Sequence, residues 1–350
     1  MSKYSIFDGH NDTLLRFYRD DDIEYSDFLS EMDGGHIDLV RARRGGFAGG
    51  FFAVFVPNPE RRIDPDSMPD LSKPYTSPPV ELAHSQPIAL RLIADLFRLE
   101  AESDGQVKVV RTADELQDCI DSDIFAAILH FEGAEAIDED LDALEVFYQA
   151  GLRSLGIVWS RPTIFAHGVP IAFPSSPDIG PGLTDAGKRL VRRCNELGIM
   201  IDLSHMNEKG FWDVAALSDA PLVATHSNAH ALCPISRNLT DKQLDAIKES
   251  DGMVGLNFAT GFLNEDGAWD ADRPLDVMVR HLDYLVERLG ETRVGLGSDY
   301  DGARVPEAVG DVSKLPNLIA ALQEAGYDDT LLQKMTHGNW LRVLRKTWKP

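Results

Sequence analysis

His10 and Asp12 form an HxD pair in a short apolar segment, and these two residue types could bind one metal ion together. In an extended strand, side chains two residues apart point to the same side, so the imidazole and the carboxylate would face one point. A histidine in an exposed loop beside an aspartate in a turn would give the same pattern. The pair therefore predicts a metal site only if the rest of the chain supplies further ligands.

Residues with metal-binding side chains also follow four later apolar segments: Glu132, His205, His226 and Asp299. Imidazole and carboxylate ligands without thiolate favour zinc, with Mn, Co or Fe as alternatives. Two neighbouring dications repel each other and need a bridging anion, and Glu132 is placed to supply it. His10 and Asp12 would then complete the site of one zinc ion. His205 and His226 would complete the site of the other.

This ligand set predicts hydrolysis. A water shared by two metal ions ionises near neutral pH and becomes a hydroxide nucleophile. Asp299 could take a proton from that water and deliver it to a leaving amine. Arg237, in the loop that follows His226, could bind a substrate carboxylate through a bidentate pair, although in a chain this acidic a surface arginine is the alternative.

Other polar residues near these positions are expected to play lesser parts. His130 lies two residues before Glu132, so it should point to the same side but deeper, and we do not assign it as a ligand. His230 is either a hydrogen-bonding neighbour of the site or a simple loop residue. Asp202 and Asp301 are expected to accept hydrogen bonds rather than to act in catalysis.

Short apolar segments alternate with amphipathic helical patterns along most of the chain. Eight segments are predicted to be strands: 6–10, 49–56, 125–131, 154–158, 200–203, 222–225, 253–257 and 294–297. Their apolar runs are continuous, as expected for parallel strands buried on both faces. This alternation predicts a closed (β/α)8 TIM barrel, in which the C-terminal ends of the strands converge on one face. An open doubly wound sheet is the alternative, and the lack of a GxGxxG after an early strand disfavours it.

Helices are predicted over 183–197, 240–248, 276–289 and 331–348. The first should end at Gly198, and Thr240 with Gln243 should form a capping box. Segment 57–79 is rich in Pro, Ser and Asp and lacks periodicity, which predicts a long loop rather than a linker. We therefore expect residues 1–350 to form one domain.

Composition excludes several classes of protein. The formal net charge of −23 disfavours nucleic acid as a partner and means that an anionic substrate group needs a local cation. No run of 18 apolar residues predicts a membrane span, and the N-terminal residues lack a secretory pattern, so we expect a cytoplasmic protein. Three widely spaced cysteines without a CxxC predict neither a disulfide framework nor a thiolate zinc site.

Together these residues resemble the renal-type (membrane) dipeptidases of the amidohydrolase superfamily. The matching segments are Asp8-Gly-His-Asn-Asp12, Phe131-Glu-Gly133, Gly182-Leu-Thr with Gly187, Leu197-Gly-Ile-Met-Ile-Asp-Leu-Ser-His205, Thr225-His-Ser-Asn228, Ser236-Arg-Asn238, Gly297-Ser-Asp-Tyr-Asp-Gly302 and Asp311-Val-Ser-Lys. The resemblance implies a zinc barrel that cleaves dipeptides, often with a D-residue at the C-terminal position, and suggests a homodimer. It implies the ligand roles given above, Asp299 as the proton shuttle, and Arg237 at the carboxylate of the substrate.

The chain departs from this family at one position. The family commonly has a histidine after the fourth strand that polarises the scissile carbonyl, whereas Trp159 occupies the corresponding place here. Because indole donates one hydrogen bond and carries no charge, carbonyl activation would rest on the metals or on Arg161, with His167 as a further candidate. A second hypothesis therefore keeps the metal site but takes another small amide, such as an N-acyl amino acid or a cyclic amide. A third is a non-catalytic metal-binding barrel.

Overall fold

The computed structural model describes residues 3–20, 22–59 and 74–349. Its strands are β1 (Ile6–Asn11), β2 (Phe47–Val54), β3 (Val107–Val109), β4 (Phe125–Glu132), β5 (Ser154–Gly156), β6 (Met200–Asp202), β7 (Val223–Ala224), β8 (Met253–Leu256) and β9 (Val294–Leu296). Eight of these strands close into a parallel barrel, because β2 pairs with β1 and β4, and β1 pairs with β9. The (β/α)8 prediction is confirmed and the open sheet is wrong.

The sequence did not predict β3. Its three residues pair in parallel with the first residues of β4, on the side where β5 pairs with the last residues of β4. It is therefore an addition at the N-terminal end of the barrel wall.

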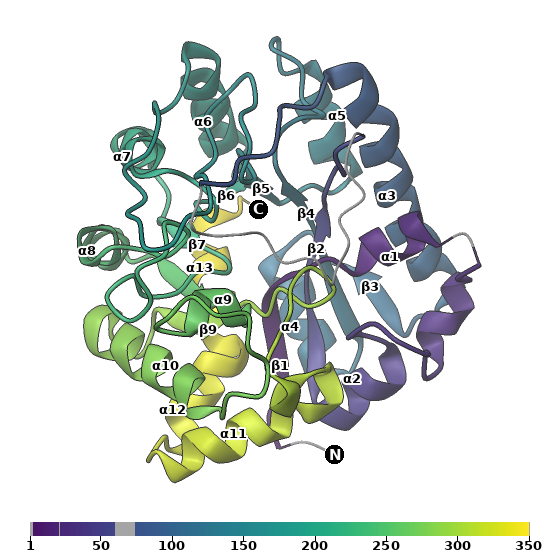
Figure 1. The fold of residues 1–350 in the computed structure, drawn as a ribbon. Helices are drawn as coiled ribbons and strands as arrows, with labels where there is room; N and C mark the ends of the chain where they lie inside the picture. The colour runs from purple at the N-terminus through teal and green to yellow at the C-terminus, as the bar shows by residue number, and fades with distance from the viewer. Residues whose placement is uncertain (1–2, 21, 60–73, 350) are drawn as a thin grey trace.

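Helices surround the strands in chain order (Figure 1). The α-helices are α1 (Thr13–Arg19), α2 (Leu39–Gly45), α3 (Leu82–Glu102), α4 (Ala113–Asp121), α5 (Asp142–Ala150), α6 (Asp185–Leu197), α7 (Glu208–Leu217), α8 (Asp241–Glu249), α9 (Thr260–Leu263), α10 (Asp276–Leu289), α11 (Leu315–Glu324), α12 (Asp329–Gln333) and α13 (Asn339–Thr347). Short 3-10 turns are η1 (Tyr25–Leu29), η2 (Glu307–Val309) and η3 (Val312–Lys314). The predicted stop at Gly198 and the capping box of Thr240 with Gln243 are both present.

The predicted helix over 331–348 is present, but it contains a π-helical turn, η4 (Lys334–Gly338), between α12 and α13. The wider turn changes the face that the following residues present. Asn339 Nδ2 donates to the backbone oxygens of Glu291 and Val294, and Trp340 Nε1 donates to Leu296 O. After this turn, the side chains of Asn339 and Trp340 face the backbone of and near β9.

The indole of Trp340 fills the N-terminal end of the barrel. It is fully buried in a cluster with Phe7, Phe51 and other strand residues. A Cβ at Gly9 would lie 2.5 Å from Trp340 Cζ2, so the strand needs glycine there. With this end closed, a ligand can reach the barrel interior only from the C-terminal ends of the strands.

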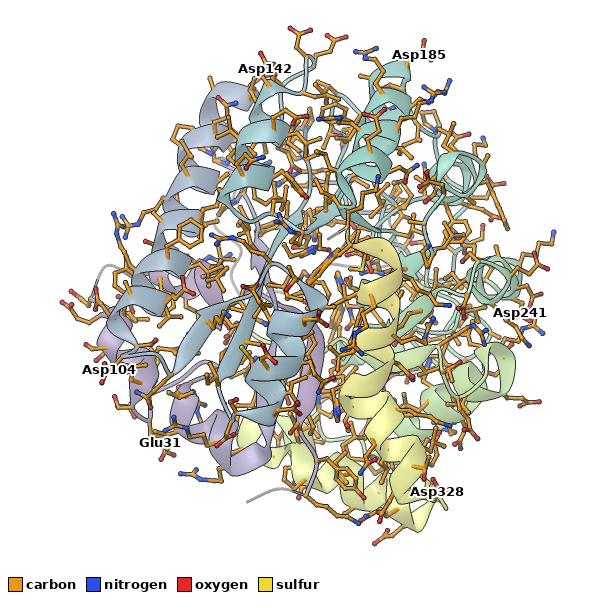
Figure 2. The ribbon with its side chains drawn as sticks, turned by 180° about the vertical axis from the view of Figure 1, so that it is seen from behind. Glu31, Asp104, Asp142, Asp185, Asp241 and Asp328 are labelled. Carbon is orange, nitrogen blue, oxygen red and sulfur yellow. The ribbon has the colours of Figure 1, made fainter. Side chains whose placement is uncertain are left out.

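The surface is acidic on many separate elements. Seen from behind the view of Figure 1, the labelled acidic residues lie around the outer rim of the molecule (Figure 2). Within the described ranges, no helix is both long enough and apolar enough to cross a lipid bilayer. Of the loop predicted over 57–79, residues 60–73 lie outside the described residues. Where the chain is described again, Tyr75 N donates to Ile171 O, which joins this part of the loop to the loop after β5.

Candidate metal centre

The barrel brings all five predicted metal ligands to one point. His10 lies near the end of β1, Glu132 ends β4 and Asp12 directly follows β1, while His205 and His226 lie within three residues of the ends of β6 and β7. All five side chains are buried. Residues at or just after the ends of four strands therefore meet at the C-terminal face, as the barrel prediction requires, although the first and the last are more than 200 positions apart in the sequence.

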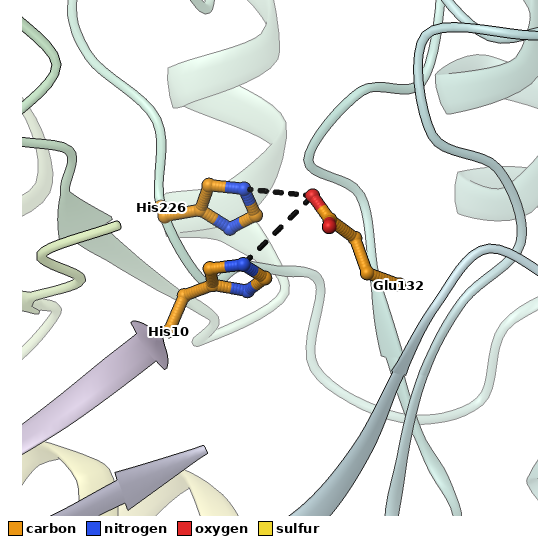
Figure 3. Close-up of side chains that lie close together, drawn as sticks. All are labelled: His10, Glu132 and His226. Carbon is orange, nitrogen blue, oxygen red and sulfur yellow. Dashed lines mark ion pairs between the residues drawn. The ribbon is translucent and has the colours of Figure 1, made fainter. Parts of the chain in front are cut away.

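Glu132 Oε1 lies at the centre of this cluster. The distances from this oxygen are 3.1 Å to His205 Nε2, 3.6 Å to His226 Nε2 and 3.8 Å to His10 Nε2. Figure 3 shows His10 and His226 side by side, both facing the carboxylate. Asp12 Oδ2 lies 3.4 Å from His10 Nε2, on the side where His10, Asp12 and Asp299 form a second group suited to a metal ion.

The surroundings of His10 fit a cation. Its ring is fully buried, yet neither ring nitrogen makes a hydrogen bond within the described part of the chain. Burial alone would lower the pKa of His10, but the carboxylates of Glu132, Asp12 and Asp299 outweigh it and raise that pKa to about 10. Burial also raises the pKa of Glu132 well above its usual range. A buried site with this excess of negative charge is suited to metal ions.

The other two histidines are held in the neutral form that binds metals. Burial, Arg237 and His10 lower the pKa of His205 well below its usual range, and the same groups lower that of His226. Their Nε2 atoms lie 3.2 Å apart. Two neutral nitrogens this close, both facing Glu132, can share the site with a cation that accepts their lone pairs.

Thr225 sets the tautomer of His226. The Thr225 hydroxyl lies 2.6 Å from Asp202 Oδ2 and 2.8 Å from His226 Nδ1. Because the carboxylate only accepts, the hydroxyl donates to Asp202 and accepts from Nδ1–H of His226. The lone pair of His226 is thereby placed on Nε2, which faces Glu132. Asp202 is the hydrogen-bonding partner that the sequence predicts.

Two residues of the site have strained backbones. His205 has a φ of 64° and Asp299 a φ of 61°, a region that non-glycine residues seldom occupy. Such strain persists where the surrounding structure holds it, and it is concentrated at functional sites. The loop after β5 holds His205 from two sides: Ser160 Oγ lies 2.9 Å from its Nδ1, and Val169 N donates to its backbone oxygen.

Arg237 is not a surface residue, because its side chain is almost fully buried. Nη1 donates to Ser227 Oγ over 2.7 Å and Nη2 to His226 O over 2.9 Å. Its Nε is buried and has no hydrogen-bond partner among the described residues. A cation with an unused donor beside the ligand cluster is suited to an anionic group of a substrate.

Trp159 lies beside the cluster, with its ring 5.8 Å from that of His205 and 5.2 Å from that of Phe55. Arg161 is fully buried, with Nε bonded to Glu135 and Nη2 to Val56 O, while its Nη1 has no hydrogen-bond partner among the described residues. His130 is buried and lies 2.9 Å from Ser154 Oγ, beneath Glu132 as expected.

The remaining histidines considered from the sequence stay outside the cluster. His230 Nε2 lies 2.9 Å from Ser175 O, so its side chain contacts the loop between β5 and α6. His167 belongs to neither of the two groups of side chains suited to a metal ion in the described structure. The sequence analysis missed Thr225, Ser160 and Asn257, and only their places beside ligands or at strand ends could have indicated them.

Comparisons with known proteins show relatives that are similar over most of this chain. The family model for membrane dipeptidases, peptidase family M19, matches residues 1–349. An uncharacterized protein in the pqqA 5′ region of Klebsiella pneumoniae is 49% identical over 257 residues, covering 73% of this chain and 95% of that protein.

Two solved structures are similar over the whole chain. The crystal structure of dipeptidase AC, a metallopeptidase, is 53% identical, with a TM-score of 0.95 and coverage of 99% of both chains. A metallopeptidase from Rhodobacter sphaeroides, liganded with a phosphinate mimic of the dipeptide L-Ala-D-Ala, is 52% identical, with a TM-score of 0.95 and coverage of 99% of this chain and 100% of that chain. This chain therefore belongs to the membrane dipeptidase family, peptidase family M19, and is a metallo-dipeptidase built on the (β/α)8 amidohydrolase barrel.

Proposed function

We propose that this metallo-dipeptidase holds two zinc ions and hydrolyses short dipeptides with a free C-terminal carboxylate, including those with a D-residue at that position. One observation carries the proposal: three histidine Nε2 atoms lie within 3.8 Å of the single oxygen Glu132 Oε1. The phosphinate mimic of L-Ala-D-Ala in the Rhodobacter sphaeroides relative supports the choice of substrate.

The ligands divide by their positions. His10 and Asp12 would hold one ion, and His205 and His226 the other, with Glu132 shared between them. Bound zinc polarises a carbonyl and lowers the pKa of a water molecule so that it can act as a nucleophile. The chain contributes neutral imidazoles, with the tautomer of His226 set by Thr225, and a buried carboxylate that balances the charge of the ions.

Asp299 is the proposed proton shuttle. Its carboxylate belongs to the group with His10 and Asp12, and burial raises its pKa above the usual range. It would take a proton from the attacking water and give that proton to the amide nitrogen as the C–N bond breaks, so that the carboxylate is regenerated in each cycle.

Arg237 is the proposed anchor for the substrate carboxylate. Its guanidinium faces the ligand cluster from the loop after β7, and burial strengthens the attraction for an anion by excluding water. Trp159 is the proposed wall for the substrate beside His205. Since its indole is uncharged, we propose that the metal ions, and not this side chain, activate the carbonyl.

We also propose that the chain is one catalytic domain that acts in the cytoplasm, and that it pairs as a homodimer. Its three cysteines are buried and free, which suits a reducing compartment. The net charge of −23 disfavours nucleic acid as a partner. The proposed partners are therefore the small-molecule substrate and a second copy of this chain.

A panel of L-Xaa-L-Xaa and L-Xaa-D-Xaa dipeptides, assayed with zinc-reconstituted protein, tests the substrate class. We expect turnover of members of both series, and no turnover across the panel would overturn the proposal. Trp159 lies beside His205, at the position where membrane dipeptidases commonly have a histidine. This difference favours a second candidate: hydrolysis of N-acyl amino acids or cyclic amides. Faster turnover of N-acetyl amino acids than of every dipeptide would support that candidate.

A further inference from the structure

Asn257 lies directly after β8 and reaches the carboxylate of Asp299. Its side chain is fully buried, and Nδ2 donates to Asp299 Oδ2 over 2.9 Å and to His226 O over 3.3 Å. Arg237 Nη2 donates to the same backbone oxygen of His226. One amide group therefore contacts the proposed proton shuttle and the backbone of a metal ligand.

The orientation of this amide is determined by its neighbours. Oδ1 of Asn257 accepts from Ala259 N over 2.6 Å, so Nδ2 is the atom that faces Asp299. The backbone is held as well: Asn257 N donates to Asn228 Oδ1, and Asn228 Nδ2 donates to Asn257 O. If the amide were flipped, its oxygen would face the carboxylate of Asp299 and its NH2 group would face the N–H of Ala259. Only the orientation described therefore allows both hydrogen bonds.

The two oxygens of Asp299 therefore have different surroundings. Oδ2 accepts from Asn257, whereas Oδ1 faces Gly302 and Asp12. A Cβ built on Gly302 would lie 2.7 Å from Asp299 Oδ1 and 2.0 Å from Asp12 Oδ2, so any side chain there would displace both carboxylates. Oδ1 thus faces the side of the site where His10 and Asp12 offer ligand atoms.

We propose that Asn257 is a positioning residue that holds Asp299 by Oδ2 and keeps Oδ1 free to carry the proton. In this scheme, Oδ1 accepts the proton released as the water oxygen bonds to the carbonyl carbon, and passes it to the nitrogen as the C–N bond breaks. The inference rests on the proposed function, in which Asp299 is the shuttle. An isolated carboxylate could rotate and present either oxygen, and the amide donor removes that freedom.

Asn257→Asp tests this role, because it keeps the size and the acceptor to Ala259 N but opposes an oxygen to Asp299 Oδ2. We expect kcat for a dipeptide to fall at least about tenfold, with KM and zinc content per chain unchanged. Asn264→Asp is the matched control: Asn264 is also buried, donates to Ala268 O and Asp270 O, and lies away from Asp299. It should lower the melting temperature similarly and leave kcat at the wild-type value.

Asp299→Asn, alone and combined with Asn257→Asp, separates the inference from the proposed function. If Asp299→Asn keeps the wild-type kcat, the shuttle role and the inference fall together. If Asp299→Asn loses activity, and Asn257→Asp is folded and zinc-loaded and keeps the wild-type kcat, only the role of Asn257 is overturned. We expect the double variant to be no slower than Asp299→Asn, since both changes act on one proton transfer. Should Asn257→Asp fail to fold, Asn257→Ser removes the same donor without a charge, and the same drop in kcat is expected.

Discussion

The hydroxyl of Thr225 lies 2.8 Å from Nδ1 of its neighbour His226 and donates its own proton to Asp202. All three side chains are buried, so water cannot replace either hydrogen bond. A single hydroxyl thereby determines which nitrogen of His226 is free for a metal ion.

Replacing Thr225 with Val should weaken metal binding. Valine keeps the shape but leaves Asp202 and His226 Nδ1 without their shared partner. We expect the zinc affinity to fall by about 10- to 100-fold, measured by competition with a chromophoric chelator. Thr225→Ser, which restores the hydroxyl, should recover most of the affinity. Equal zinc affinities for Thr225→Val and wild type would contradict the tautomer assignment.

Arg237→Met should act on substrate binding through the carboxylate. We expect kcat/KM for a dipeptide to fall by about 100-fold or more, mainly through KM, because a buried charge-assisted contact is lost. A dipeptide amide, which lacks the carboxylate, should already be a poor substrate for the wild type and should lose little further in the variant. An equal loss for both substrates would assign Arg237 a purely structural role through its bonds to Ser227 and His226.

Trp159→Phe should have little effect on turnover. The indole packs between Phe55 and His205, and phenylalanine keeps an aromatic wall there while removing the N–H donor. If that donor polarised the carbonyl, its loss would lower kcat by up to about tenfold. We expect kcat within about twofold of wild type. A tenfold drop would show that the indole N–H polarises the carbonyl.

Asp251 should stabilise the fold in a pH-dependent way. A hydrogen bond from Lys346 lowers the pKa of Asp251 below its ordinary value, and Arg342 and Arg293 add to the effect, with Arg293 Nη2 2.8 Å from Oδ1. A lowered pKa means that the stabilisation is complete above the unfolded value of about 3.9 and is lost as the pH falls through the folded value.

Asp251→Asn should therefore lower the free energy of unfolding at pH 7 by about 1 kcal/mol or less, since the site is partly exposed. Asparagine tolerates the positive φ of 56° at this position, so the backbone is not strained by the change. Urea unfolding at pH 7, 4 and about 2.5 should show a nearly unchanged difference between variant and wild type down to about pH 4 and a smaller difference at about pH 2.5. A constant difference across this range would rule out the ionic contribution.

The sequence predicted the barrel and its ligand cluster because both follow from strand ends. Once the segment ending in Glu132 and the segments before His205 and His226 are taken as parallel strands, their polar end residues must meet on one face. Nothing further is needed to bring His10 to the same point. Ligand roles remain a proposal, but the convergence itself is confirmed by the distances to Glu132.

The parts that the sequence did not predict depend on contacts between distant segments. Asn257 and Thr225 are ordinary polar residues after apolar runs, and their partners Asp299 and Asp202 become neighbours only in the closed barrel. The three-residue strand β3 is too short to give a periodic pattern. The π-helical turn precedes Asn339, whose side chain donates to the backbone near β9, and local helical periodicity does not encode this contact between distant segments.

Zinc stoichiometry per chain, compared between wild type and Glu132→Ala, tests the central claim most directly. The protein is stripped with a chelator, reloaded with zinc, passed over a desalting column and measured by elemental analysis. The Nε2 atoms of His10, His205 and His226 all lie within 3.8 Å of Glu132 Oε1. We therefore predict about two ions in wild type and about one or none in the variant. A wild type that retains a single ion, or a Glu132→Ala protein that retains two, would contradict a shared carboxylate at a paired zinc site.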